Sequence, residues 1–156
     1  MKKVLGILLF IIIVPAAWSI PNVTLYDQGE KAHKFESLLG DLTVVLVYRD
    51  RNAADDGKAH LRIVHENLGD KTVVVRIADM SKVPGLFKGL AINQIKNKFE
   101  DYPYYLDEEG STVSLFNVGE GEYGLFLYRG RNEEKRKIES FREKRDMRET
   151  LEDFLQ

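Results

Sequence analysis

Two short apolar runs with a helical pattern between them constrain the fold of this chain more than any other feature. Thr43–Tyr48 and Thr72–Ile77 consist mainly of β-branched and apolar residues, which is typical of strands that are covered on both faces of a sheet. Between them, apolar residues recur at helical spacing as far as Leu68, and Asp55 or Asp56 is available as the N-cap. A strand, a helix and a second strand of these lengths predict a right-handed βαβ unit with parallel strands.

The rest of the chain continues the alternation of helices and strands. The predicted elements are a helix over Ser81–Phe99, a strand over Tyr102–Leu106, a strand or short helix within Ser111–Val118, a strand over Leu125–Tyr128, an edge strand that ends near Phe141, and a helix that begins at Asp146. The lysines of Ser81–Phe99 would also suit a helix that lies on a membrane, although a solvated helix face over the sheet is the simpler interpretation. These elements predict an α/β domain with a central mixed β-sheet flanked by helices.

The N-terminus has the pattern of a secretory signal. Two lysines precede an apolar run of eleven residues, Val4–Val14, and small residues follow. This pattern predicts a signal peptide over residues 1–19, with cleavage after Ser19, and one mature domain over residues 20–156. A retained membrane anchor is the alternative, but the run is shorter than the ~20 apolar residues that a spanning helix needs. We therefore expect a periplasmic or secreted protein with no stable membrane span in its mature form.

Composition argues against several classes of function. The chain has 23 Lys and Arg against 25 Asp and Glu, and this mildly acidic balance argues against nucleic acid as a partner. It contains no cysteine, so its stability must come from packing and not from disulfides. His33, His60 and His65 are too scattered to predict a metal site. No cofactor is predicted either, because the glycines near Glu120 and Glu122 stand beside carboxylates that would repel a phosphate.

Two segments in the second half of the chain carry a resemblance to a known family. Residues 102–118, YPYYLDEEGSTVSLFNV, contain an aromatic-Pro pair that opens a strand, an acidic-Gly turn and an aromatic-x-Val ending. Residues 124–128, GLFLY, form the next apolar strand. Together with the order of the elements, these segments resemble the redoxin branch of the thioredoxin superfamily, the peroxiredoxins and the envelope thiol-disulfide oxidoreductases. The resemblance covers about residues 23–156 and implies a thioredoxin-like fold.

The resemblance also implies where a catalytic cysteine would lie. In redoxins the nucleophile follows the first buried strand, at the N-terminus of the next helix, where the helix dipole lowers the pKa of a thiol. Counting from Thr43–Tyr48, the two positions of a CxxC motif fall near Ala53 and Asp56, and neither residue can act as a thiolate. The chain thus resembles a redoxin that lacks its catalytic cysteines.

A second position of the family is changed as well. Oxidoreductases of this type carry a cis-proline just before the third strand, where peroxiredoxins carry an arginine, and the corresponding residue here is Tyr123, beside Gly124. A competing register would use Pro103, but a turn and a predicted helix follow it and not a hairpin. The export signal, the empty CxxC position and the Tyr-Pro strand are also similar to the YtfJ-type proteins of bacterial periplasms.

We expect any ligand site to lie at the carboxyl ends of the strands, where open α/β sheets bind their ligands. The candidate residues at this edge are Arg49, Asp50, Arg51, Asn52 and Asp56 from the loop after the first buried strand, with Tyr123 and Gly124 opposite. A peptide or a small acid held by Arg49 or Arg51 is the ligand that this arrangement predicts. The same arginines could equally pair with neighbouring aspartates.

Three functions remain open at this point. The favoured one is an exported, non-catalytic binding or interaction module of the bacterial cell envelope, whose partner would be an envelope protein or a small ligand. The second is an enzyme that uses Asp50 or Asp56 as an acid or base, which would require a raised pKa in a shielded cleft. The third is a redox accessory protein that docks on a true oxidoreductase. A calcium loop over Asp50–Asp56 is a weaker alternative, because its glycine falls two positions late and no glutamate closes it.

Overall fold

The computed structural model describes residues 22–98, 102–130 and 135–139. In chain order, its elements are β1 (Thr24–Tyr26), β2 (Ala32–Lys34), the 3-10 helix η1 (Phe35–Leu38), β3 (Leu42–Tyr48), α1 (Arg51–Leu68), β4 (Val73–Asp79), α2 (Gly85–Lys98), β5 (Tyr104–Asp107), α3 (Ser111–Leu115), β6 (Tyr123–Arg129) and β7 (Lys135–Glu139). The predicted signal peptide of residues 1–19 and the predicted helix from Asp146 lie outside the described residues. Within those described ranges, no helix is both long enough and apolar enough to cross a membrane.

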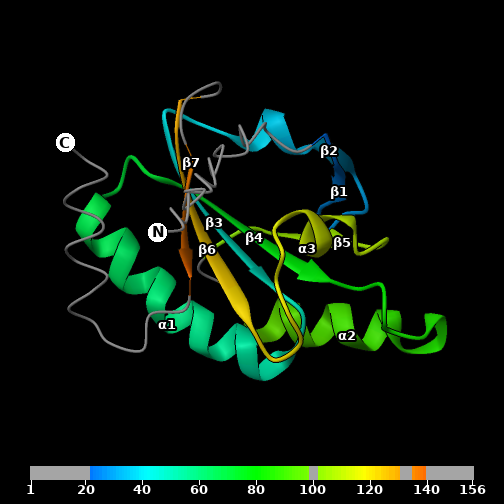
Figure 1. The fold of residues 1–156 in the computed structure, drawn as a ribbon. Coiled ribbons are helices and arrows are strands. Elements are labelled where there is room, and N and C mark those ends of the chain that lie inside the picture. Colours follow the sequence, from blue (N-terminus) through cyan, green and yellow to red (C-terminus); the bar gives the residue numbers. More distant parts are fainter. Residues whose placement is uncertain (1–21, 99–101, 131–134, 140–156) are drawn as a thin grey trace, which may run out of the picture.

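Seven strands form one mixed sheet in the order β2-β1-β5-β4-β3-β6-β7 (Figure 1). β3, β4 and β5 run parallel, whereas β6 pairs antiparallel with β3 and β1 pairs antiparallel with β5. The parallel pairing of β3 with β4 across α1 confirms the predicted strand-helix-strand unit. The prediction of an α/β fold with a central mixed sheet flanked by helices is also confirmed.

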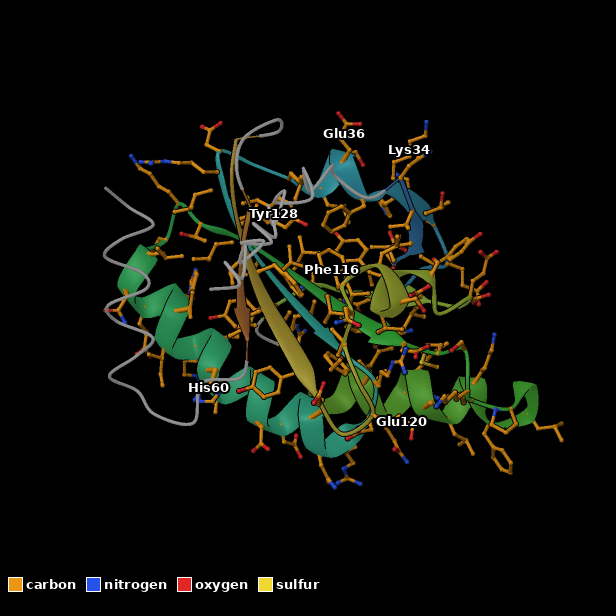
Figure 2. All side chains as sticks on the ribbon, in the orientation of Figure 1. Lys34, Glu36, His60, Phe116, Glu120 and Tyr128 are labelled. Carbon is orange, nitrogen blue, oxygen red and sulfur yellow. The ribbon has the colours of Figure 1, made fainter. Side chains whose placement is uncertain are left out.

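Each face of the sheet has its own buried core. Successive residues of a strand point to opposite faces. In β3, Val44 and Leu46 therefore pack on the face covered by α1 and α2, whereas Val45 and Val47 pack on the face covered by η1 and α3. Figure 2 shows this division: His60 lies on α1 below the sheet, and the aromatic ring of Phe116 lies above it. With both faces covered, the central strands can be apolar throughout, as the sequence indicates.

Helix α1 begins at Arg51, so the prediction of a start near Asp55 or Asp56 was wrong by one turn. The N-cap is Asp50, whose side chain accepts a hydrogen bond from the backbone N–H of Ala53. The first turn was missed because its buried residues are small and add little to a hydrophobic pattern. Gly57 shows how close this helix lies to the sheet: a Cβ atom there would be 2.7 Å from Cδ1 of Leu46.

Several other elements differ from their predicted ranges, each for a local reason. The N-terminal hairpin of β1 and β2 was not predicted, because each strand has only three residues and no clear alternation. β5 begins at Tyr104 and not at Tyr102, since Pro103 has no N–H to donate to a sheet. The ambiguous Ser111–Val118 segment contains the short helix α3. Helix α2 begins at Gly85, directly after Pro84.

Candidate ligand-binding site

A cavity of about 240 Å³ lies at the carboxyl ends of β3 and β4, between the beginning of α1 and helix α2. Its apolar lining residues are Ala54, Ala78, Met80, Val83, Ala91 and Ile95. Its polar lining residues are Tyr48, Arg49, Asp50, Arg51, Asp55, Asp79 and Gln94. The cavity therefore combines an apolar interior with charged groups from two loops, at the edge of the sheet where ligands of open α/β folds bind.

An arginine and an aspartate from adjacent strands meet at this cavity. Arg49 follows β3 and Asp79 ends β4, and Nε of Arg49 lies 3.7 Å from Oδ2 of Asp79. The other oxygen of Asp79 accepts hydrogen bonds from the backbone N–H of Ser81 at 2.9 Å and from its hydroxyl at 2.6 Å, so the carboxylate is fixed in place. An arginine has five N–H donors, more than one distant carboxylate can accept. The half-buried Arg49 thus keeps donors for an anionic group.

Tyr48, which also lines the cavity, has a buried hydroxyl near Arg76. Its side chain is 5% exposed, and its hydroxyl has no hydrogen-bond partner among the described residues. Burial raises the pKa of Tyr48 to about 12, although the nearby Arg76 guanidinium opposes part of this shift. This oxygen has almost no accessible surface, so the protein covers it and it does not face the cavity as a donor.

Asp50 is used for structure on both of its carboxylate oxygens. Oδ1 accepts the N–H of Ala53 at 3.0 Å, which caps α1, and Oδ2 accepts the N–H of Gly121 at 2.8 Å. Gly121 belongs to the loop that leads into β6. Asp50 therefore ties the start of α1 to this loop, which fits a positioning role better than that of a proton donor or metal ligand.

Replacing Asp50 with alanine should lower the free energy of unfolding by about 1–3 kcal/mol, because the substitution removes a helix cap and the acceptor of a second hydrogen bond. Asp50→Asn is the matched control: asparagine is an equally good cap, so it should lose clearly less. Urea denaturation of both variants measures the difference. Asparagine keeps one acceptor oxygen for the cap but cannot accept the bond from Gly121, so equal losses would show that the capping bond to Ala53 contributes little.

The remaining predicted site residues fall into two groups. Arg51 lines the cavity, whereas Asn52 and Asp56 are exposed on α1 and do not line it. Tyr123 and Gly124 begin β6 and are buried, and they do not line it either. The structure thus brings Arg49, Asp50 and Arg51 together at one cavity and places the β6 pair beside it.

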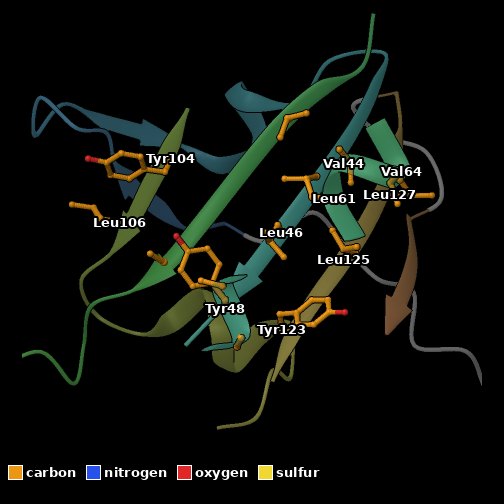
Figure 3. Close-up of a cluster of buried hydrophobic side chains, with 14 of the residues drawn as sticks. Val44, Leu46, Tyr48, Leu61, Val64, Tyr104, Leu106, Tyr123, Leu125 and Leu127 are labelled. Atoms are coloured by element: carbon orange, nitrogen blue, oxygen red, sulfur yellow. The ribbon is translucent and has the colours of Figure 1, made fainter. Parts of the chain in front are cut away.

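Tyr123 points away from the cavity. Figure 3 shows the hydroxyls of Tyr48 and Tyr123 on neighbouring strands, directed to opposite sides. The hydroxyl of Tyr123 is hydrogen-bonded to Nδ1 of His60, and the centroids of the two rings are 5.6 Å apart. Burial, and then the charge of Asp56, raise the pKa of Tyr123 to about 12. The residue that the sequence resemblance assigns to the family's cis-proline position is therefore a tyrosine that packs on α1.

Sequence reasoning missed the half of the cavity that comes from β4 and α2. Asp79 and Met80 lie at the end of a buried strand just as Arg49 does, so the same rule about carboxyl ends would have identified them. The sequence does not mark Gln94 and Ile95 as cavity residues, because whether they line the cavity depends on the distance between α2 and α1 in the folded chain. No group of three or more metal-ligating side chains occurs among residues 22–98, 102–130 and 135–139.

Comparison with known proteins identifies the fold. No protein-family model matches the sequence, and no curated protein matches it. Among solved structures, the chain is similar to an exposed lipoprotein thioredoxin from Streptococcus pneumoniae, with a TM-score of 0.62 and 13% sequence identity. The match covers 85% of this chain and 99% of the thioredoxin. A secreted disulfide oxidoreductase from Mycobacterium tuberculosis has a TM-score of 0.57 and 13% sequence identity, and the match covers 83% of this chain and 93% of the oxidoreductase. The peroxidoxin BcpB from the same organism has a TM-score of 0.54 and 16% sequence identity, and the match covers 86% of this chain and 92% of BcpB.

These neighbours are redoxins of both types to which the sequence segments point, and two of them are described as exposed or secreted. At such low identity the likeness establishes the fold and not the activity, and the YtfJ-type assignment stays a prediction. The chain has no cysteine with which to carry out thiol chemistry. This chain is thus a thioredoxin-like, redoxin-fold protein without cysteine.

Proposed function

We propose that this protein is an exported, non-catalytic redoxin-fold module of the bacterial cell envelope, and that it binds a small carboxylate ligand with an apolar body. The observation that carries this proposal is the cavity between α1 and α2, in which an apolar interior adjoins the guanidinium of Arg49. The ligand could be a free acid or the C-terminal carboxylate of a peptide, since both present the same group.

The chemistry of the cavity supports each part of such a ligand. Guanidinium–carboxylate pairs are charge-assisted and can be bidentate, and Arg49 and Arg51 both line the cavity. The alanine, methionine and isoleucine side chains of the interior suit an aliphatic or aromatic body and exclude water from the ion pair.

Export is supported by the basic and apolar pattern of residues 1–19 and by the exposed and secreted neighbours of the same fold. A binding role is supported by the missing cysteine, because a chain without a thiol cannot itself form the mixed disulfide of thiol-disulfide exchange. The purified protein should therefore show no insulin reduction and no peroxidase turnover.

Binding can be tested by NMR titration with octanoate and with phenylacetate, using octylamine as the charge-reversed control. Shifts should be confined to the residues that line the cavity and should not occur with the amine. Arg49→Met should weaken binding about tenfold or more, because a charge-assisted pair is lost. Arg62→Met, which changes an exposed arginine elsewhere on α1, is the matched control and should leave the affinity unchanged.

Either of two results would contradict the proposed ligand. One is the absence of any shift at the cavity with both acids and with a peptide that carries a free C-terminal carboxylate. The other is equal weakening by Arg49→Met and Arg62→Met, which would show a general effect of charge and no site.

A further inference from the structure

Helix α2 exposes three large apolar side chains to solvent. Leu86 is 92% exposed, Phe87 57% and Leu90 61%. Leu90 follows the other two by four and three positions, and residues at these spacings are neighbours on a helix, so the three side chains form one continuous surface, which we call the α2 apolar patch. The opposite face of α2 packs on the core through Ala91, Ile92 and Ile95. α2 is therefore apolar on two faces, and packing on the sheet uses only one of them.

Two lysines stand near the patch in the sequence, Lys88 within the helix and Lys82 just before it. Gly85–Lys98 contains Lys88, Lys96 and Lys98 and no aspartate or glutamate, although the whole chain has a net charge of −2. Lys82 precedes the helix and is paired with Glu120, whose position next to α2 is seen in Figure 2. Lys88 lies 3.8 Å from Glu108. The Lys82–Glu120 pair is largely exposed and the Lys88–Glu108 pair is partly exposed, and ion pairs at the surface are weak enough to exchange partners.

The patch lies at the edge of the domain where the described chain begins. β1 runs antiparallel to β5 with Tyr26 opposite Leu106, so the residues before Thr24 lead towards Glu108, the partner of Lys88. Figure 1 shows that the first turns of α2 extend past the carboxyl ends of β3 and β4 at this same edge.

We propose that the α2 apolar patch docks this domain on an anionic lipid surface. Leu86, Phe87 and Leu90 enter the boundary between headgroups and acyl chains, and the lysines beside them contact lipid phosphates. A lipid surface accounts for the two observations together, since long apolar side chains and flexible lysines on one helix are the chemistry of interfacial helices. This proposal does not depend on the cavity or on its ligand.

The experiment uses the protein as it is recovered after export from an expressing bacterium, with its N-terminus established by mass spectrometry. Trp18 is the single tryptophan of the chain, so the double variant Trp18→Phe, Phe87→Trp reports on the patch alone, whether or not the leader has been removed. Vesicles of phosphatidylglycerol and phosphatidylcholine in equal parts should shift the emission to shorter wavelength, and brominated lipids should quench it. Pure phosphatidylcholine vesicles should do much less, and high salt should reverse the effect.

Co-sedimentation provides the second measurement. Leu86→Ser with Leu90→Ser should reduce vesicle binding of the exported protein at least tenfold, with an unchanged circular dichroism spectrum. Leu115→Ser, at an apolar side chain that is 56% exposed on α3, is the matched control and should bind as the parent does. Arg49→Met should also bind as the parent does, which separates this proposal from the ligand site.

Two outcomes would overturn the proposal. The first is a tryptophan emission of the Phe87→Trp reporter that does not respond to anionic vesicles. The second is a dimer in sedimentation that becomes a monomer in the Leu86→Ser, Leu90→Ser variant without any vesicle binding by the parent, which would assign the patch to a second copy of this chain.

Discussion

Phe126→Ala should lower the free energy of unfolding by about 3–5 kcal/mol, the usual cost of removing a fully buried phenylalanine. Phe126 lies in β6 at the centre of the core between the sheet and α3, and it is completely buried. Its ring centroid is 4.3 Å from that of Phe116. The ring also covers Gly124, where an added Cβ would come within 2.6 Å of it. Neighbours held by strand pairing cannot move in to fill the space, so a large part of the cavity should remain.

Urea denaturation gives this value if the m-value is unchanged. Leu115→Ala is the control, because it removes a similar apolar side chain from an exposed position and should change stability by no more than about 0.5 kcal/mol. A loss below about 1 kcal/mol for Phe126→Ala would contradict the packing described for this face of the sheet.

The second large effect is alkaline unfolding. Tyr48 and Tyr123 each have a pKa raised to about 12, and burial also raises the pKa of Tyr128. In the unfolded chain a tyrosine ionises near a pH of about 10, so the folded state holds these protons more tightly. The resulting stability is fully present below about pH 10 and is lost as the pH rises through about 12. At about 1.4 kcal/mol per pKa unit, Tyr48 alone accounts for roughly 3 kcal/mol.

Free energies of unfolding measured across this pH range should therefore fall steeply, and tyrosinate absorbance should rise in the same transition. Tyr48→Phe should be nearly neutral at pH 7, because its hydroxyl has no hydrogen-bond partner to lose among the described residues, and its alkaline decline should be shallower. Identical alkaline curves for Tyr48→Phe and the parent would contradict the role given to burial at this residue.

The central sheet could be predicted because its signal is local. β3, β4 and β6 are apolar along most of their lengths, and runs of this length and spacing are typical of buried strands. The hairpin of β1 and β2 carries no comparable signal, since its stability comes from pairing with β5 and from contacts of Leu25 that are distant in sequence. The start of α1 was misplaced for a similar reason: what holds its first turn is the fit of small residues against the sheet.

The candidate site was predictable only from the strand ends. Arg49, Asp50 and Arg51 come directly after a buried strand, and all three line the cavity at the carboxyl ends of β3 and β4. The direction of the Tyr123 side chain depends on its contact with His60, which lies 63 residues away in the chain. The use of both oxygens of Asp50 by backbone N–H groups likewise depends on where the Gly121 loop folds.

The burial of Ala53 has a consequence for any attempt to return thiol chemistry to this fold. Ala53 lies in the first turn of α1 and is only 2% exposed, whereas Asp56 is exposed. A thiol introduced by Ala53→Cys would lie in an apolar contact with no access for a substrate disulfide, and burial would hold it in its unreactive protonated form. Cysteines at the two positions that the sequence resemblance assigns to the motif, Ala53 and Asp56, should therefore not restore the reaction. A reactive thiol at residue 53 would require the first turn of α1 to move outward from the sheet.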